Sequence, residues 1–264
     1  QFDVQSNGAV LNNSRTGTAS GVGGYVQANP WMAQGTARVI LNEVNSTAAS
    51  QLQGPVEVAG DRAEVIIANP AGIAVNGGSF INASAVTLTT GTAVVNAGNL
   101  DGYRVQGGMV SVSGQGLDTS GADYTSILAR AGQVNAGIWA KDLRVGTGAN
   151  SLSASGVSSG AASGAAPVKV TLQANSVDAA PTYALDVSAL GGMYAGKIYL
   201  VGTDAGVGIR NSGYIGATSG DVTISHNGWL SNGGSIVAAG NTSIATQGSQ
   251  THSGVTGAQG QLSL

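Results

Sequence analysis

The sequence predicts an all-β protein, a right-handed parallel β-helix (β-solenoid), from three observations: short alternating apolar runs, abundant glycine and a repeat of about 20 residues. Glycine accounts for 43 of the 264 residues, 42% of the chain is apolar, and charged residues make up only 9%. Average soluble proteins carry roughly 25% charged residues. A chain this apolar is not expected to be disordered. Because aromatic residues make up only 5%, the predicted core consists mainly of small aliphatic side chains.

Short runs rich in β-branched residues recur along the chain and predict its strands. Glycine, asparagine or aspartate bounds these runs and indicates tight turns between neighbouring strands. Ala122–Arg130 is the best candidate for a helix, and it is long enough for only about two turns. The predicted strands include Val39–Leu41, Val65–Ile67, Val86–Thr89, Val110–Val112, Val168–Leu172, Ile198–Val201 and Val222–Ile224.

An internal repeat near the C-terminus indicates how the strands stack. Ile209–Ala217 recurs 21 residues later as Leu230–Ala238, with aliphatic residues, asparagine, glycine and alanine at matching positions. The alternation of Lys197–Leu200 returns in the same way at Asp221–Ile224. A repeat of this length suits one coil of a solenoid, whose strands pair with the coils above and below at about 4.8 Å. We expect regular coils over about residues 195–250.

We expect a single domain, residues 1–264, with two departures from regular coils. The N-terminal part is less regular and more polar, and we assign about residues 1–30 to a cap. A solenoid needs such a cap because its first coil otherwise presents an open sheet edge. Residues 146–167 are uncharged and rich in glycine, alanine and serine, and they lack strand alternation. They predict an extra-helical loop, since similar coils lie on both sides.

Charge, cysteine content and hydropathy exclude several classes of function. The net charge is −3 and basic residues are not clustered, so nucleic acid is not an expected partner. The absence of cysteine excludes disulfides and cysteine-based sites. No apolar stretch reaches the about 18 residues of a transmembrane helix. The first residues lack the pattern of a signal peptide, so we expect that any such peptide has been removed. We also expect a monomer.

Residues that suggest catalysis are few. Enzymes that cleave polysaccharides use clustered carboxylates, and Asp101, Asp118 and Asp123 lie close enough in sequence to face one groove. Each lies beside glycine, however, where a turn aspartate needs no further role. His226 and His252 are isolated, are expected to be exposed, and lack the spacing of zinc ligands. We therefore expect no catalytic residue, no metal site, no cofactor and no enzymatic activity.

Two Ala-Asn-Pro tripeptides stand out, Ala28–Pro30 and Ala68–Pro70. Proline fixes φ and disfavours helical geometry in the residue before it, while asparagine can cap a turn through its own side chain. Taken alone, the tripeptides fit two similar structural turns as well as they fit a recognition site. The candidate site residues are Asn29, Pro30, Trp31 and Met32 in the first motif, and Asn69, Pro70, Ala71, Gly72 and Ile73 in the second.

With its surroundings, this pair of motifs resembles the N-terminal two-partner-secretion domain of the filamentous-haemagglutinin family, which contact-dependent growth-inhibition toxins share. The family's Asn-Pro-Asn-Leu and Asn-Pro-Asn-Gly-Ile motifs correspond to Asn29–Met32 and Asn69–Ile73. Trp31 and Ala71 each replace the family's second asparagine, and Asn76–Gly78 stands where some relatives carry a cysteine pair. The resemblance covers nearly the whole chain and is closer to the toxin branch. It extends through Arg38–Val44, Leu52–Val58, Phe80–Ser84, Leu88–Gly91, Ile127–Arg130, Val134–Gly137 and Gly191–Lys197.

The resemblance implies a secretion domain, exported through the periplasm to the cell surface or the medium. In this family, periplasmic POTRA domains of a dedicated outer-membrane β-barrel transporter recognise the N-terminal domain, and the β-helix folds as it emerges. Asn29–Met32 and Asn69–Ile73 would then either contact the transporter or nucleate the first coils. The main alternative is a surface adhesin module that binds glycans or host cells. That function requires a ladder of exposed aromatic residues, whereas Trp31, Trp139 and Trp229 are scattered along the sequence.

Overall fold

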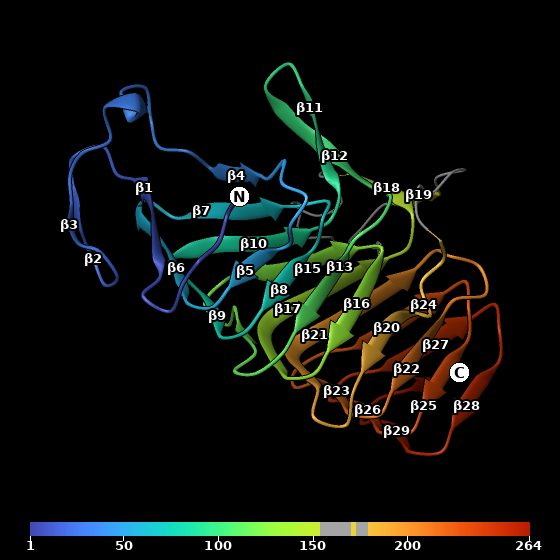
Figure 1. Ribbon diagram of the computed structural model, residues 1–264. Helices are drawn as coiled ribbons and strands as arrows, with labels where there is room; N and C mark the ends of the chain where they lie inside the picture. Colours follow the sequence, from blue (N-terminus) through green and yellow to red (C-terminus); the bar gives the residue numbers. More distant parts are fainter. Residues whose placement is uncertain (154–169, 173–178) are drawn as a thin grey trace.

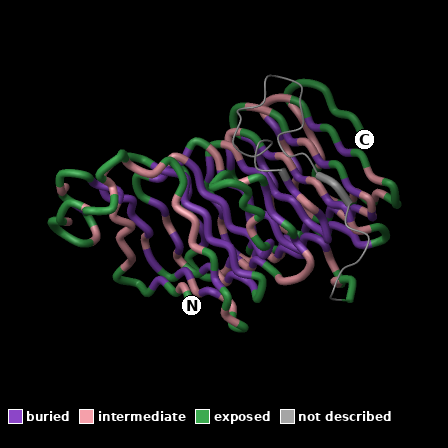
Figure 2. Tube along the Cα trace, turned by 90° about the horizontal axis from the view of Figure 1, so that it is seen from above, coloured by how far each residue is buried: buried purple, intermediate pink, exposed green. Residues whose placement is uncertain are grey.

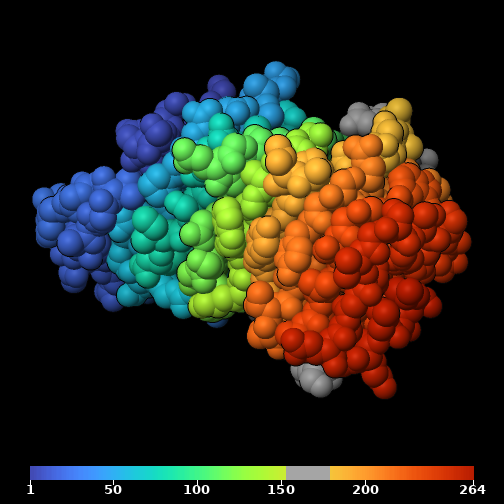
Figure 3. All heavy atoms as spheres, turned by 90° about the horizontal axis from the view of Figure 1, so that it is seen from below, coloured from blue at the N-terminus to red at the C-terminus, as the bar shows by residue number. Residues whose placement is uncertain are grey.

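The computed structural model describes residues 1–153, 170–172 and 179–264. Within these residues the chain winds into an elongated stack of parallel strands, the expected right-handed parallel β-helix (Figure 1). The coils follow one another in sequence order from the N-terminal to the C-terminal end (Figure 3). The helical part of the described chain is one short 3-10 helix, η1 (Pro30–Met32).

One 16-stranded sheet supplies two of the three sides of the solenoid. The long strands β17 (Gly137–Thr147) and β21 (Gly192–Gly202) pair with strands on both sides and so join them. The first side contains β1 (Ala9–Asn13), β6 (Pro55–Gly60), β9 (Gly78–Ile81), β14 (Leu117–Asp118), β23 (Tyr214–Ala217), β26 (Ser235–Ala238) and β29 (Val255–Ala258). The second contains β4 (Val39–Glu43), β7 (Ala63–Ala68), β10 (Ala83–Thr89), β15 (Tyr124–Ala129), β24 (Val222–His226), β27 (Thr242–Thr246) and β30 (Leu262–Ser263).

An eight-stranded parallel sheet forms the third side and confirms the repeat found in the sequence. Ile209 pairs with Leu230 in this sheet, and Asn211 pairs with Asn232. The shorter pattern is also in register on the second side, where Ile198 pairs with Val222. The strands of the third side are β5 (Ser50–Leu52), β8 (Ile73–Val75), β13 (Met109–Val112), β16 (Ala131–Val134), β20 (Tyr183–Val187), β22 (Gly208–Asn211), β25 (Leu230–Asn232) and β28 (Gln250–His252).

Two antiparallel sheets lie outside the coils. The hairpin of β2 (Thr18–Ser20) and β3 (Gly24–Val26) projects from the N-terminal end (Figure 1). The second is a four-stranded sheet of β11 (Thr92–Asn96), β12 (Asn99–Val105), β18 (Asn150–Ser153) and β19 (Val170–Leu172). The loop expected at residues 146–167 overlaps this region: its first two residues end β17, residues 150–153 form β18, and residues 154–167 lie outside the described residues.

The best helical candidate of the sequence, Ala122–Arg130, is not a helix, because most of this segment is strand β15. Ile127 packs in the central core, whereas its neighbour Leu128 packs in a second cluster beneath the extra-helical sheet. A strand that is buried on both faces loses the alternation of apolar and polar residues. Its sequence therefore cannot be told from a short buried helix by periodicity alone.

The main core is built mainly from aliphatic side chains. Buried residues follow one another along the solenoid (Figure 2). Val65, Leu88, Leu143 and Leu200 are representative, with at most 1% of each residue exposed. The second cluster consists of Ile66, Tyr103, Val105, Leu128 and Leu152. In the part of the chain that the structure describes, no helix has the length and apolar character to span a bilayer.

Candidate functional site

The first Asn-Pro turn lies on the surface and starts η1. Oδ1 of Asn29 accepts a hydrogen bond from the Trp31 amide at 3.1 Å, and Pro30 is the first residue of η1. Nδ2 of Asn29 donates to the Asn12 carbonyl at 2.9 Å, and the Asn29 amide donates to the Ser14 carbonyl at 2.7 Å. Because Asn12 belongs to β1, these bonds tie the turn to a strand that pairs with the coils.

The second turn has the same design but lies at the corner between β7 and β8. Oδ1 of Asn69 accepts from the Ala71 amide at 3.0 Å, and the Asn69 carbonyl accepts from the Gly72 amide at 2.9 Å. Nδ2 of Asn69 donates to the Ala48 carbonyl at 3.0 Å and to Oγ of Ser50 at 3.1 Å. Asn69 is fully buried. Its side chain therefore holds the corner together and offers no polar atom to solvent.

The two departures from the family motifs fall where the turn uses only the backbone. Trp31 and Ala71 each donate their amide to the asparagine two residues earlier. Their side chains are not needed for this bond and face solvent: Trp31 is 90% exposed, and Ala71 is also exposed. The turn geometry is therefore compatible with tryptophan or alanine at this position.

Gly72 and Ile73 connect the second turn to the core. Gly72 has φ +119°, a conformation that side chains disfavour, and an added Cβ would lie 3.0 Å from the Met109 carbonyl oxygen. The Gly72 carbonyl accepts from the Ser50 amide at 3.0 Å. Ile73, which is 1% exposed, begins β8 and pairs with Ser50 and Val110. Gly72 thus allows the close approach of three coils.

The exposed residues of the two turns occupy separate places. Asn29 bonds to Asn12 of β1 and to Ser14, which follows β1. Asn69 bonds instead to residues at the start of β5 and just before it. The structure therefore does not bring the two turns together. Pro70 and Ala71 are exposed at the corner after β7. Trp31 projects beside a shallow groove, in which Met32 is half-buried. The groove is lined by Arg15, Thr16, Ala28, Asn29, Pro30, Met32 and Ala33.

The three aspartates considered for catalysis do not share a groove. Asp101 lies in β12 of the extra-helical sheet. Asp118 accepts from the Ser120 amide at 2.9 Å and from its hydroxyl at 2.7 Å, while Asp123 pairs with Arg62 at 3.3 Å. Within residues 1–153, 170–172 and 179–264, no three His, Cys, Asp or Glu side chains are grouped so as to hold a metal ion.

The expectation that His226 is exposed is wrong, because only 2% of it is accessible. Its Nδ1 accepts from the Gly228 amide at 2.7 Å, whereas Nε2 is buried without a hydrogen-bond partner in the described structure. Burial lowers the pKa of His226 to about 4, although the Asp204 carboxylate acts in the opposite direction. The ring is therefore neutral near pH 7. His252 is half-buried and contacts Thr256.

Trp139 is not isolated, because it belongs to a ladder of stacked rings. Its ring centroid lies 6.2 Å from that of Tyr194, at an interplanar angle of 12°, and Tyr194 lies 5.0 Å from Tyr214 at 19°. Trp139 and Tyr194 are 42% and 39% exposed. The sequence did not reveal this ladder because its members are far apart along the chain. An added Cβ would collide with one of the rings at each of Gly137, Gly192 and Gly216.

Known proteins resemble this chain over most of its length. The family model of the TPS secretion domain matches residues 1–232. Toxin CdiA of Yersinia pestis is 47% identical over 257 residues, 97% of this chain, and tRNA nuclease CdiA-2 of Burkholderia pseudomallei (strain 1026b) is 43% identical over 235 residues, 87% of this chain. The chain spans 7% of the length of each of these relatives. The crystal structure of the filamentous hemagglutinin secretion domain superposes with a TM-score of 0.87 at 33% identity, covering 100% of this chain and 87% of that one.

Fold, turns and relatives together define a class of protein, the secretion domains built as parallel β-helices. This chain belongs to the TPS, or two-partner-secretion, domain family. The resemblance inferred from Asn29–Met32 and Asn69–Ile73 is thereby confirmed. The nuclease activity named for some relatives belongs to proteins of which this chain covers a small part, and it is not assigned to this domain.

Proposed function

We propose that this domain directs the export of a longer exoprotein. POTRA domains of an outer-membrane β-barrel transporter bind it in the periplasm, and its coils then nucleate the β-helix on the outside of the cell. Membership of a family of proteins that are secreted to the cell surface or the medium supports this proposal. No activity is assigned to the remainder of the exoprotein, because the chain spans only 7% of the length of the CdiA relatives.

The observation that carries the proposal is the difference between buried and exposed residues in the Asn-Pro turns. Asn69 has partners for both its Nδ2 and its Oδ1 and is fully buried, so we assign it to folding. Trp31, Pro70 and Ala71 are exposed, and we assign them to contact with the transporter. Tryptophan is enriched among the residues that dominate binding energy in interfaces.

We also propose that about residues 1–30 cap the first coil and keep the domain monomeric. The Glu57 carboxylate holds the β2–β3 hairpin, accepting from Oγ of Ser20 at 2.7 Å, the Val22 amide at 2.8 Å and the Gly21 amide at 3.0 Å. Strand β1 pairs with the outer edge of β6, and β1 in turn is covered in part by the Asn29 turn, whose Nδ2 donates to the Asn12 carbonyl of β1 at 2.9 Å. A covered edge is less able to pair with another chain, which supports a monomer.

The folding role is tested by comparing Asn69→Ala with Asn211→Ala. Asn211 is an apt control because it is also fully buried, donates two hydrogen bonds and accepts one from the Gly213 amide. Each substitution should lower the free energy of unfolding by about 2–4 kcal/mol, because buried partners lose their hydrogen bonds. Only Asn69→Ala should slow refolding, since it lies in the first coils. Equal refolding rates in stopped-flow fluorescence would exclude a nucleating turn.

The contact role is tested by the affinity of the folded domain for isolated POTRA domains. Trp31→Ser should weaken binding roughly tenfold or more while leaving the unfolding transition unchanged. Leu190→Ser is the matched control, because Leu190 is 87% exposed but lies far along the chain. Calorimetry that gives the same dissociation constant for Trp31→Ser and for the unmodified domain would show that Trp31 is not a contact residue.

The aromatic ladder supports a second candidate function, binding of a glycan on the first side of the solenoid. Trp139, Tyr194 and Tyr214 place three rings side by side and leave parts of Trp139 and Tyr194 accessible. A glycan array should show binding that Tyr194→Ala abolishes. An array without signal for the folded domain would remove this candidate and leave the ladder as a packing element.

A further inference from the structure

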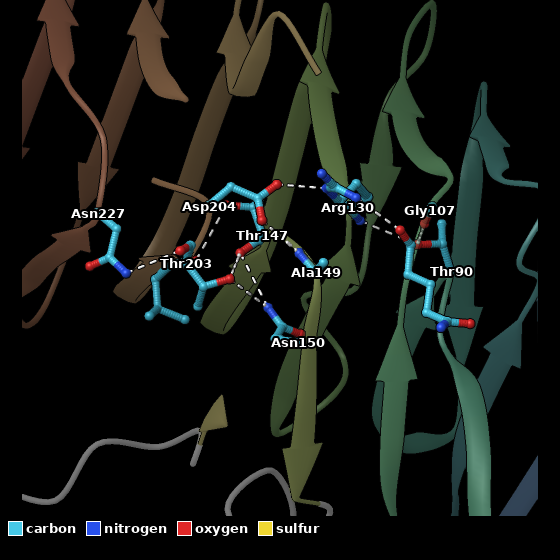
Figure 4. Close-up of polar contacts among 11 residues, drawn as sticks. Thr90, Gly107, Arg130, Thr147, Ala149, Asn150, Thr203, Asp204 and Asn227 are labelled. Carbon is cyan, nitrogen blue, oxygen red and sulfur yellow. Dashed lines mark hydrogen bonds and ion pairs between the residues drawn. The ribbon is translucent and has the colours of Figure 1, made fainter. Parts of the chain in front are cut away.

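We infer that Arg130 and Asp204, an ion pair distant from the Asn-Pro motifs in sequence, position the corner that contains the Asn69–Pro70 turn. The guanidinium Nε of Arg130 donates to Oδ2 of Asp204 at 2.6 Å, although 74 residues separate them (Figure 4). Both side chains are largely buried, with 6% of Arg130 and 14% of Asp204 exposed. The inference deepens the proposed function and rests on it only where export is concerned.

Arg130 reaches from this ion pair towards the loop of residues 106–108. Its Nη1 donates to the Gln106 carbonyl at 3.0 Å, and the Ala131 amide donates to the Gly108 carbonyl at 3.3 Å. Thr90, in the neighbouring coil, also binds this loop: its hydroxyl donates a hydrogen bond to the Gly107 carbonyl at 2.7 Å (Figure 4). The loop is thus held by the side chain of Arg130 on one side and that of Thr90 on the other.

The loop in turn packs against the Asn69–Pro70 turn. An added Cβ on Gly108 would lie 2.5 Å from the Pro70 carbonyl oxygen and 2.8 Å from Cβ of Thr90, so the backbone of the loop fills this space. The Asn69 amide donates to the Thr89 carbonyl at 2.9 Å, which links the turn to the coil of Thr90. Contacts therefore run without interruption from Asp204 through Arg130 and the 106–108 loop to the turn.

Asp204 is suited to hold this corner closed. Its Oδ1 accepts from the Ala149 amide at 3.0 Å while Oδ2 accepts from Arg130, so one carboxylate joins two coils (Figure 4). A buried guanidinium that loses its carboxylate is strongly destabilised and must reach water. If Arg130 swings outward, the Gln106 carbonyl loses its donor, and the loop behind the turn loosens. The corner is then complete only after the chain has folded as far as Asp204.

The test compares amide hydrogen exchange in Asp204→Asn and Asp186→Asn. Asp186 pairs with Arg210 at 2.7 Å on the third side of the solenoid, away from the corner. The Asp186 side chain is about as buried as that of Asp204, at 12% against 14% exposed, whereas Arg210 is 45% exposed. Asp204→Asn should speed exchange at the Ala71 and Gly72 amides, and at the Ala131 amide that donates to the Gly108 carbonyl, by roughly tenfold or more. Asp186→Asn should leave them unchanged. Unchanged exchange in Asp204→Asn, or an equal rise in both variants, would overturn the inference.

A double variant keeps the test decisive if Asp204→Asn does not fold. Arg130→Gln combined with Asp204→Asn leaves no unpaired buried charge, so it should fold. It also removes the Arg130 donor to the Gln106 carbonyl, so exchange at the Ala71 and Gly72 amides should still be faster than in the unmodified domain. A folded double variant that protects these amides as well as the unmodified domain does would contradict the positioning role.

A secretion assay distinguishes failure of the positioning role from failure of the proposed function. With the transporter present, Asp204→Asn should be secreted several-fold less than Asp186→Asn. If Asn69→Ala is secreted normally while Asp204→Asn still exposes the Ala71 and Gly72 amides, the corner is positioned as inferred but has no part in export. If exchange is unchanged while Asn69→Ala blocks export, the proposed function stands and the positioning role is lost.

Discussion

Single polar residues at the corners of the coils determine how tightly each turn is held. Asn69 and Asn211 are fully buried, and each accepts a hydrogen bond from the amide two residues further on. His226 makes a similar bond to the Gly228 amide, but its Nε2 is buried without a partner in the described structure. Protonation would place a charge on this ring without a carboxylate bonded to it. The fold therefore depends on His226 remaining neutral.

His226 should make the domain less stable in acid. The pKa of His226 is about 4 in the folded chain and about 6.5 in the unfolded chain. The stability that depends on a neutral His226 ring is therefore fully present above pH 6.5 and is lost as the pH falls towards 4. The loss approaches about 3 kcal/mol at most. Urea unfolding at pH 7, 5 and 4 should show a smaller loss in His226→Gln than in the unmodified domain. His252→Gln is the control, and a His226→Gln variant as acid-sensitive as the parent would contradict this.

At the scale of strands, the sequence predicted the pairing of the coils where their repeat is regular. The 21-residue repeat predicted the pairing of Ile209 with Leu230, because coils that stack in register repeat their inward residues. Sequence reasoning did not identify β15 as a strand, because both of its faces are buried and the alternation of apolar and polar residues is lost. It also missed the ladder that contains Trp139, since Trp139 and Tyr194 are far apart in sequence. The two Asn-Pro turns were predicted, but their hydrogen-bond partners were not.

The extra-helical sheet should depend on the second cluster beneath it. Leu152 of β18 is 2% exposed and packs there with Tyr103 and Leu128. Leu152→Ala should reduce the free energy of unfolding by about 2–5 kcal/mol, because it leaves a cavity in a closed cluster. Leu190→Ala, at an exposed leucine, should change it little. Chemical denaturation that shows no difference between the two variants would mean that the cluster closes around the missing side chain.

The whole molecule is suited to folding in the order in which the chain emerges. Most strands pair with strands of the preceding and following coils, so each new coil can add to an existing edge. Among the described residues, features that depart from this order include the ion pair between Arg130 and Asp204 and the sheet that joins β12 to β18. Both link an early coil to a segment made later. The loop of residues 106–108 behind the Asn69–Pro70 turn should therefore reach its final packing late, whereas the turn's own hydrogen bonds join it to residues 48, 50 and 89 and can form with the first coils.

Secretion in the presence and absence of the transporter tests the central claim most directly. The domain, supplied with a signal peptide, would be expressed with and without its cognate transporter and quantified in the medium and the periplasm. We expect it in the medium only when the transporter is present, and we expect Asn69→Ala to block this while Asn211→Ala permits it. Retention in the periplasm with the transporter present, or release without it, would contradict a role in transporter-dependent export.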